Sequence, residues 1–238
     1  MISWCMAPTD TDGRAAERAA ALLSHAELGH LVRLRLPKRR REWLLGRAAV
    51  KRLCCAHLQR AGRSVAPHEL SVLADPDGAP RVHREDGDAL AVTVSVSHRA
   101  GMVVAALCEG TDARLGIDVE LCEPRPATFA ADYFTAAELA FVEQAPAGER
   151  ARIETEVWSL KEATLKALRV GLSVDTRSIE VRPRHASAPG WGRAEVIRPG
   201  APGGAMVRDL GSYVVSVVLL DRSLVPEPTL EHEVPEER

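Results

Sequence analysis

One helical segment occurs twice in the chain, first as Trp43-LLGRAAVKR-Leu53 and again as Trp158-SLKEATLKA-Leu168. The two copies share five of eleven residues, and the shared pairs are Trp43/Trp158, Leu45/Leu160, Ala48/Ala163, Lys51/Lys166 and Leu53/Leu168. We expect each copy to lie in a long helix. An internal repeat of this kind predicts two related halves.

A second repeat precedes each long helix. Ser24-His-Ala-Glu27 and Thr135-Ala-Ala-Glu138 both place a hydroxyl and a glutamate at the spacing of a capping box, which starts a helix. Strand patterns follow in both halves, with turn signals between them. The expected strands are Leu70–Ala74, Val92–His98 and Met102–Cys108 in the first half, and Ser178–Arg182, Trp191–Ile197 and Gly211–Leu220 in the second.

The order of elements in both halves is therefore a helix, a longer helix and antiparallel strands. This order predicts the α+β fold class, as a pseudo-dimer of two similar α+β halves. The first half is expected at residues 1–112 and the second at 113–220. Residues 221–238 are acidic, contain proline and are weakly apolar, which predicts a flexible tail.

The composition excludes several classes of protein. The 238 residues are 46% hydrophobic and 27% charged, which is ordinary for a globular protein. A net charge of −2 and an aromatic content of 4% argue against a nucleic-acid partner. No apolar stretch approaches the roughly 18 residues of a membrane span, and the N-terminus shows no signal-peptide pattern. Five cysteines without a CxxC pair predict reduced thiols and a cytoplasmic location.

Two acidic residues share one face of a predicted strand at 115–121. Side chains of a strand alternate, so Asp118 and Glu120 lie on the face opposite the apolar residues, about 7 Å apart at their Cα atoms. A solvated strand face is one interpretation. The other is a site for a hard cation such as Mg²⁺, which carboxylates and substrate phosphates hold together.

The second long helix carries Glu162 and Lys166 four residues apart, on one face. An exposed ion pair is the simple interpretation. The repeat favours another, because the Trp43/Trp158 alignment sets Arg47 and Lys51 at the equivalent positions of the first half. Facing helices would then oppose basic groups to carboxylates, as a phosphate–Mg²⁺ substrate requires.

A basic run surrounds the first long helix. It could be a solvated face, or a clamp in which arginine forks bind a terminal phosphate or an acidic protein. Ser97-His98, at the end of a predicted strand, could donate to the same phosphate. The basic residues are Arg33, Arg35, Lys38, Arg39, Arg40, Arg41, Arg47, Lys51 and Arg52.

The chain resembles the Sfp-like (surfactin-synthetase-activating) class of 4′-phosphopantetheinyl transferases across roughly residues 20–220. The motifs that carry the resemblance are Gly116-Ile-Asp118-Val-Glu120, Trp158-Ser-x-Lys161-Glu162-Ala-x-x-Lys166-Ala, Ser95-Val-Ser97-His98-x-x-Gly101 and Gly46-Arg47. The resemblance implies a pseudo-dimer with its active site at the interface between the halves.

The resemblance also implies an activity. Such an enzyme transfers the 4′-phosphopantetheine arm of coenzyme A to a serine of acyl or peptidyl carrier proteins, and releases adenosine 3′,5′-bisphosphate. Lys166 is expected on the pyrophosphate, and Glu162 is the candidate general base, directly or through a metal-bound water. The expected metal ligands, for Mg²⁺ or Mn²⁺, are Asp118, Glu120 and Glu162; the expected CoA ligands are Arg39, Arg40, Arg47, Ser97, His98 and Lys166.

The chain departs from the pattern of this class at one turn. Many members of the class carry Lys near a Gly-x-Pro turn, whereas this turn reads Asp77-Gly-Ala-Pro-Arg81, so Arg81 could replace that contact. The resemblance places the carrier-docking region at residues 122–133. The alternatives are a non-catalytic CoA- or carrier-binding homologue and another Mg²⁺-dependent phosphotransferase. We expect a monomer.

Overall fold

The computed structural model describes residues 2–8, 14–111, 113–184, 190–197 and 203–220, together with the backbone of 230–233. The chain divides into two compact units. Unit 1 comprises Met1–Asp112 with Leu230–Arg238, and unit 2 comprises Ala113–Thr229. In the described part of the chain, no helix is long and apolar enough to cross a membrane.

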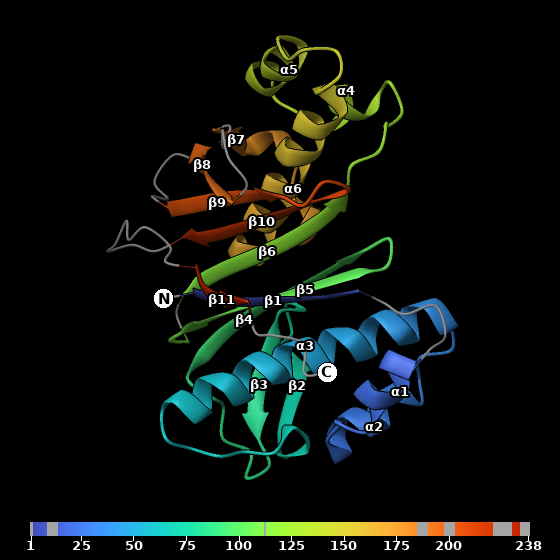
Figure 1. Ribbon diagram of the computed structural model, residues 1–238, viewed down its shortest axis with the longest axis vertical. Helices are drawn as coiled ribbons and strands as arrows, with labels where there is room; N and C mark the ends of the chain where they lie inside the picture. Colours follow the sequence, from blue (N-terminus) through green and yellow to red (C-terminus); the bar gives the residue numbers. More distant parts are fainter. Residues whose placement is uncertain are drawn as a thin grey trace. The chain divides into compact units, whose positions relative to one another are not determined.

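Unit 1 is built around the long helix α3 (Figure 1). Helix α3 packs on a sheet of strand order β11-β1-β5-β4, and β2 and β3 form a separate hairpin. The core lies between α3 and these strands. The elements are β1 Ile2–Pro8, α1 Arg14–Ala20, α2 His25–Leu31, α3 Pro37–Arg60, the 3-10 turn η1 Pro67–Glu69, β2 Leu70–Ala74, β3 Pro80–Arg84, β4 Val92–Arg99, β5 Met102–Glu109 and β11 Leu230–Glu233.

Unit 2 has the same plan with a continuous sheet. Its five strands are antiparallel in the order β6-β10-β9-β8-β7, and α6 packs on β6 and β10 (Figure 1). The elements are β6 Arg114–Leu121, α4 Phe129–Tyr133, α5 Ala136–Glu143, α6 Arg150–Leu168, the 3-10 turns η2 Gly171–Ser173 and η3 Thr176–Ser178, β7 Glu180–Pro183, β8 Trp191–Ile197, β9 Gly203–Asp209 and β10 Tyr213–Leu220.

Four strands were not expected from the sequence: β1, β3, β9 and β11. Ile2–Pro8 forms β1, whose seven residues pair antiparallel with β5. Leu230–Glu233 forms β11, which pairs in parallel with β1, so these four residues of the predicted flexible tail are a strand. The other tail residues, 221–229 and 234–238, lie outside the described residues. A four-residue strand depends on its partner strand, which a local sequence pattern does not contain.

Both predicted capping boxes are confirmed. The Ser24 N–H donates to Glu27 and the Glu27 N–H returns to the Ser24 hydroxyl, at 2.9 and 3.4 Å. The corresponding distances between Thr135 and Glu138 are 2.8 and 3.2 Å. Each box begins the short helix that precedes the long one, as the spacing predicts.

The glutamate of each capping box also binds a buried lysine and a strand N–H. Glu27 is fully buried, receives the ammonium of Lys51 from α3, and accepts the N–H of Val72 at 2.9 Å. It thereby ties α2 to both α3 and β2. A buried carboxylate keeps its charge when a cation and hydrogen-bond donors surround it in this way.

Unit 2 repeats this arrangement at Glu138, and the repeat corrects the sequence alignment. The Lys161 ammonium lies 2.8 Å from Glu138, which also accepts the Val181 N–H at 2.8 Å. Lys161 is therefore the counterpart of Lys51, at a spacing of 110 residues rather than the 115 of the tryptophan alignment. The prediction that Lys51 corresponds to Lys166 is wrong.

The same correction applies to Arg47, which is not the counterpart of Glu162. A buried ammonium must meet its carboxylate, so the Glu–Lys pair sets the register of each long helix. Tryptophan and leucine identities at other positions carry no such constraint. The two units share a framework, and their candidate chemical residues differ.

Candidate active site

Gly116 brings strand β6 and helix α6 into direct backbone contact. A β-carbon at this position would stand 1.8 Å from the carbonyl oxygen of Ala163 and 2.8 Å from the nitrogen of Ala167. Only glycine allows this approach. Asp118 and Glu120 follow on the same face of the strand as Gly116, so this face is turned towards α6.

Asp118 and Glu120 do not lie on a solvated face. They are only 2% and 9% exposed. Asp118 Oδ1 accepts a hydrogen bond from Lys166 Nζ at 2.7 Å, and the same ammonium lies 3.2 Å from the carbonyl oxygen of Ile117. The structure thus brings the predicted strand acid and the predicted helix lysine together.

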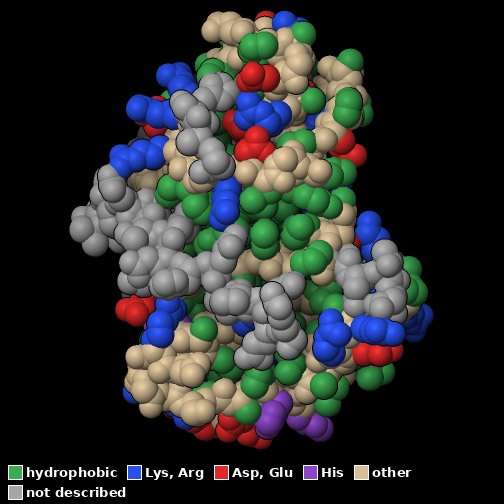
Figure 2. Space-filling model, in the orientation of Figure 1, with side chains coloured by type: hydrophobic (Ala, Val, Ile, Leu, Met, Phe, Trp, Pro, Cys, Tyr) green, Lys and Arg blue, Asp and Glu red, His purple; other side chains and the backbone are tan. Residues whose placement is uncertain are grey.

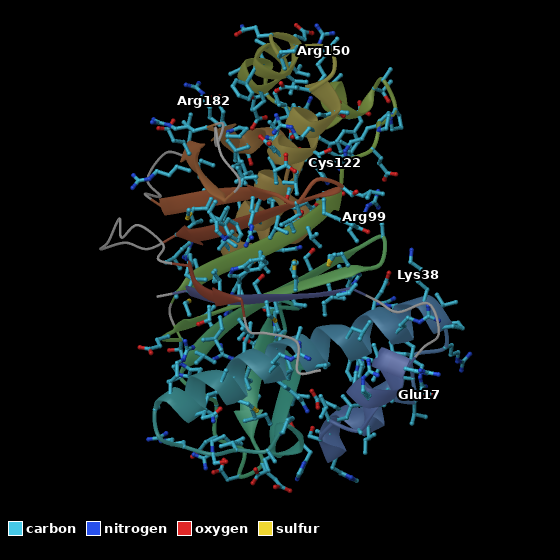
Figure 3. All side chains as sticks on the ribbon, viewed as in Figure 1. Glu17, Lys38, Arg99, Cys122, Arg150 and Arg182 are labelled. Atoms are coloured by element: carbon cyan, nitrogen blue, oxygen red, sulfur yellow. The ribbon has the colours of Figure 1, made fainter. Side chains whose placement is uncertain are left out.

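Glu120 has a partner that sequence reasoning missed. Arg125 Nη2 donates to Glu120 Oε2 at 3.0 Å, and the Arg125 side chain is 9% exposed. Arg125 belongs to the segment that Cys122 begins, directly after β6 (Figure 3). Its guanidinium lies 4.5 Å from the centre of the Phe129 ring. The sequence places Arg125 five residues after Glu120, but this spacing predicts a contact only if the loop after β6 is known to fold back onto the strand.

Glu162 completes the acidic cluster from the helix side. Burial and the negative charges of Asp118 and Glu120 raise the pKa of its carboxyl, Lys166 and Arg125 act in the opposite direction, and the net value is about 7. The charges of both strand acids therefore act on Glu162. A carboxyl group that titrates near neutral pH can exchange protons with a substrate.

The donor chemistry of this cluster suits a hard divalent cation. Carboxylate oxygens are the ligands that Mg²⁺ and Mn²⁺ prefer, and Asp118 and Glu120 each hold a side-chain cation in the structure. Among the residues described, no three His, Cys, Asp or Glu side chains stand together as a formed metal site. The residues present fit a divalent ion by charge and by ligand type.

The predicted CoA ligands of unit 1 lie along α3 and at the end of β4. Arg39 and Arg40 are exposed, and Arg40 Nη1 donates to the Leu31 carbonyl at 3.3 Å. Figure 2 shows Lys and Arg side chains over the end of α3 where these residues lie. This end of the helix is a basic surface that can receive anions.

Arg47 is more enclosed, with 14% of its side chain exposed. Its guanidinium lies 4.7 Å from the Trp43 ring centre, and Nε is buried without a hydrogen-bond partner, 4.0 Å from Glu27. Burial lowers the pKa of Arg47, and the charge of Glu27 opposes the change. A buried donor without a partner is suited to an anionic ligand.

Ser97 and His98 are brought to α3 by another glycine. A β-carbon at Gly46 would meet Val96 of β4 at 3.3 Å, so helix and strand approach closely here. His98 Nδ1 lies 3.8 Å from Glu42 of α3, and Ser97 is 8% exposed. The Gly-Arg motif on α3 and the Ser-His motif on β4 are far apart in the sequence, but the two elements that carry them are neighbours within unit 1.

Two further predicted residues have structural partners. Lys51 is held by Glu27 and by the Leu22 carbonyl at 2.7 Å, inside unit 1. Arg81 Nε forms a two-point contact with Asp75, at 3.0 and 2.9 Å. Arg81 therefore pairs with an acid across the turn between β2 and β3.

Most of unit 2 lies in a segment that matches a known protein family. Residues 114–214 match the family model of the 4′-phosphopantetheinyl transferase superfamily. This range contains all three acids, Lys166 and Arg125.

A relative and two solved structures are similar to the chain. A Synechocystis protein, provisionally named a 4′-phosphopantetheinyl transferase, is 26% identical over 155 residues, or 64% of this chain; the chain spans 59% of that relative's length. The holo-(acyl-carrier-protein) synthase of Bacillus anthracis in complex with CoA (3′,5′-ADP) is 20% identical, over 44% of this chain and 93% of its own, with a TM-score of 0.38. The holo-[acyl-carrier-protein] synthase of Thermotoga maritima is 21% identical, over 45% of this chain and 62% of its own, with a TM-score of 0.37.

Proposed function

We propose that this protein is a 4′-phosphopantetheinyl transferase of the Sfp-like class. It transfers the phosphopantetheine arm of coenzyme A to a serine of an acyl or peptidyl carrier protein and releases adenosine 3′,5′-bisphosphate. The observation that carries the proposal is the acidic cluster in which the buried Asp118 and Glu120 lie beside the partly exposed Glu162 and Lys166, inside the segment that matches the superfamily.

Asp118, Glu120 and Glu162 would hold Mg²⁺, with Mn²⁺ as a substitute. The ion supplies positive charge to the pyrophosphate oxygens of coenzyme A. Transfers of this kind depend on positioning and on charge neutralisation more than on covalent chemistry by the protein. The burial of Asp118 and Glu120 supports the assignment, because charges in a site with little water act strongly.

Glu162 is the proposed general base. Its carboxylate takes the proton of the carrier serine hydroxyl as that oxygen attacks the phosphorus that bears the pantetheine. Its pKa of about 7 is that of the metal-free protein; a divalent ion at the site would lower this pKa and keep the carboxylate ionised, so that it can accept a proton. Lys166 contacts the pyrophosphate and stabilises the charge that develops on the leaving phosphate.

Unit 1 supplies the proposed ligands of the adenosine 3′-phosphate. These are Arg39, Arg40, Arg47, Ser97 and His98, whose hydroxyl, imidazole and guanidinium donors are those that phosphate oxygens accept. The proposed ligands of coenzyme A then come from both units. We also propose that the protein acts as a monomer in the cytoplasm, where its five free cysteines would stay reduced.

The test is mass spectrometry of a panel of apo carrier proteins incubated with the enzyme, coenzyme A and Mg²⁺. The expected result is a gain of one phosphopantetheine on at least one carrier. Asp118→Ala and Glu120→Ala should abolish the gain, and Glu143→Gln, an exposed glutamate of α5, should leave it unchanged. No gain on any carrier would overturn the proposed activity, and transfer by either alanine variant at the wild-type rate would overturn the metal assignment.

A further inference from the structure

Each of the two strand acids is held by its own side-chain cation. Lys166 Nζ lies 2.7 Å from Asp118 Oδ1, and Arg125 Nη2 lies 3.0 Å from Glu120 Oε2. Both carboxylates are buried, so each needs a positive partner. The positions that a divalent ion would take on the two carboxylates are therefore shared with two monovalent cations.

Arg125 is built into its place rather than lying on the surface. Its guanidinium is within 4.5 Å of the Phe129 ring centre and 6.0 Å of the Trp158 ring centre. Nε is buried and has no hydrogen-bond partner. A guanidinium has five N–H donors in a planar fork, and the Glu120 contact uses only one end of it. Arg125 is thus a buried cation beside the proposed pyrophosphate site, and its Nε is available to donate a further hydrogen bond.

The charge balance favours replacement of the two side-chain cations by a divalent ion at the carboxylates. With the three carboxylates ionised, two side-chain cations leave the cluster at a formal charge of −1, which repels a phosphate. A divalent ion changes this to +1, and the cluster then attracts phosphate. A divalent ion on Asp118 and Glu120 also takes over the oxygens that Lys166 and Arg125 now bind, so both side chains gain free donors as the cluster becomes positive.

We propose that Arg125 and Lys166 are exchangeable counter-ions: they neutralise Glu120 and Asp118 in the metal-free protein, and after a divalent ion binds they transfer their hydrogen bonds to the phosphate oxygens of coenzyme A. The inference rests on the proposed function and adds Arg125 as a phosphate ligand. It requires that metal and coenzyme A each strengthen the binding of the other.

The side chains can make this change without unfolding the site. Lys166 is 28% exposed and has a flexible stem. Arg125 lies on aromatic faces, over which a guanidinium can slide while it keeps its cation–π contact. The ring of Tyr133, 4.9 Å from that of Phe129, extends this surface.

The experiment measures Mn²⁺ binding by electron paramagnetic resonance, without carrier protein, and CoA binding by calorimetry. In the absence of CoA, Arg125→Gln should bind Mn²⁺ about tenfold more tightly than the wild type, because a competing cation is gone. In saturating Mn²⁺, the same variant should bind CoA about tenfold more weakly. Arg125→Lys, which keeps the charge, should restore most of both values.

The matched control is Arg182→Gln. Arg182 is a half-exposed arginine of β7, at the edge of the same sheet opposite to β6 (Figure 3), and its removal should change neither affinity. Lys166→Met provides a second test should Arg125→Gln not fold, and it too should tighten Mn²⁺ and weaken CoA.

Mn²⁺ affinity that is unchanged or weaker in both variants would overturn the exchange, as would unchanged affinity for CoA. These outcomes are separate from the proposed function, because the wild type could still modify a carrier protein. A wild type that binds no Mn²⁺ would instead remove the metal site itself, and the exchange with it.

Discussion

Gly116 of β6 lies directly against the Ala163 carbonyl of α6, so that a β-carbon at residue 116 would stand 1.8 Å from that oxygen. This contact sets the distance between the strand that carries Asp118 and Glu120 and the helix that carries Glu162 and Lys166. The geometry of the site therefore depends on Gly116, which has no functional side chain.

Gly116→Ala should separate strand and helix. The added methyl group meets backbone rather than a flexible side chain, so unit 2 should lose roughly 3 kcal/mol or more of unfolding free energy, measured by urea denaturation. Gly148→Ala is the control, since nothing lies within 4 Å of a β-carbon there. If both variants unfold at the wild-type urea midpoint, the backbone contact is not as close as described.

Lys161→Met should destabilise unit 2 strongly, by roughly 3 to 5 kcal/mol, because Glu138 would keep a buried charge without its cation. Lys51→Met should do the same in unit 1, where Glu27 loses the equivalent partner. Lys38 is the control, because its side chain is 84% exposed. The free energy of unfolding of Lys38→Met (Figure 3) should stay within about 0.5 kcal/mol of the wild-type value. Equal stability of all three variants would show that the buried pairs do not set the helix register.

The raised pKa of Glu162 predicts a pH dependence of stability in metal-free buffer. The folded protein holds this proton more tightly than the unfolded chain, so the contribution of Glu162 to the free energy of unfolding is largest below about pH 4.5 and falls as the pH rises to about 7. Glu162→Gln should remove this fall, and at pH 8 in EDTA it should be roughly 2 kcal/mol more stable than the wild type. Denaturation curves at pH 5 and pH 8 measure the effect.

Added metal provides the complementary measurement. Mg²⁺ at pH 8 should restore the stability that the ionised Glu162 removes from the wild type, and it should have little effect on Glu162→Gln. Glu143→Gln, at an exposed position of α5, should behave as the wild type throughout. A wild type that loses no stability relative to Glu162→Gln between pH 5 and pH 8 in EDTA would contradict the raised pKa.

Arg47→Ala should separate the 3′-phosphate from the rest of coenzyme A. Loss of a charge-assisted contact should weaken CoA binding roughly tenfold to a hundredfold, whereas 3′-dephospho-CoA should lose little, both measured by calorimetry in Mg²⁺. Arg41→Ala, an exposed neighbour on α3, should affect neither ligand strongly. Equal losses for both ligands on Arg47→Ala would exclude Arg47 from the 3′-phosphate site.

Local patterns in the amino-acid sequence were sufficient for much of the framework. The capping boxes at Ser24 and Thr135 depend on contacts three residues apart, and the shared face of Asp118 and Glu120 follows from strand alternation. Glu162 and Lys166 share a helix face for a similar reason. These features are properties of single elements, so they are visible before the chain folds.

Other features depended on packing between distant residues. The register of the repeat follows from the burial of Lys51 and Lys161 with their glutamates, whereas the sequence identities suggested a different alignment. The pairing of Arg125 with Glu120 needs the loop after β6 to fold back, and β11 needs β1 as a partner. A buried charge must find its counter-ion in three dimensions, and local sequence does not record which partner the fold brings to it.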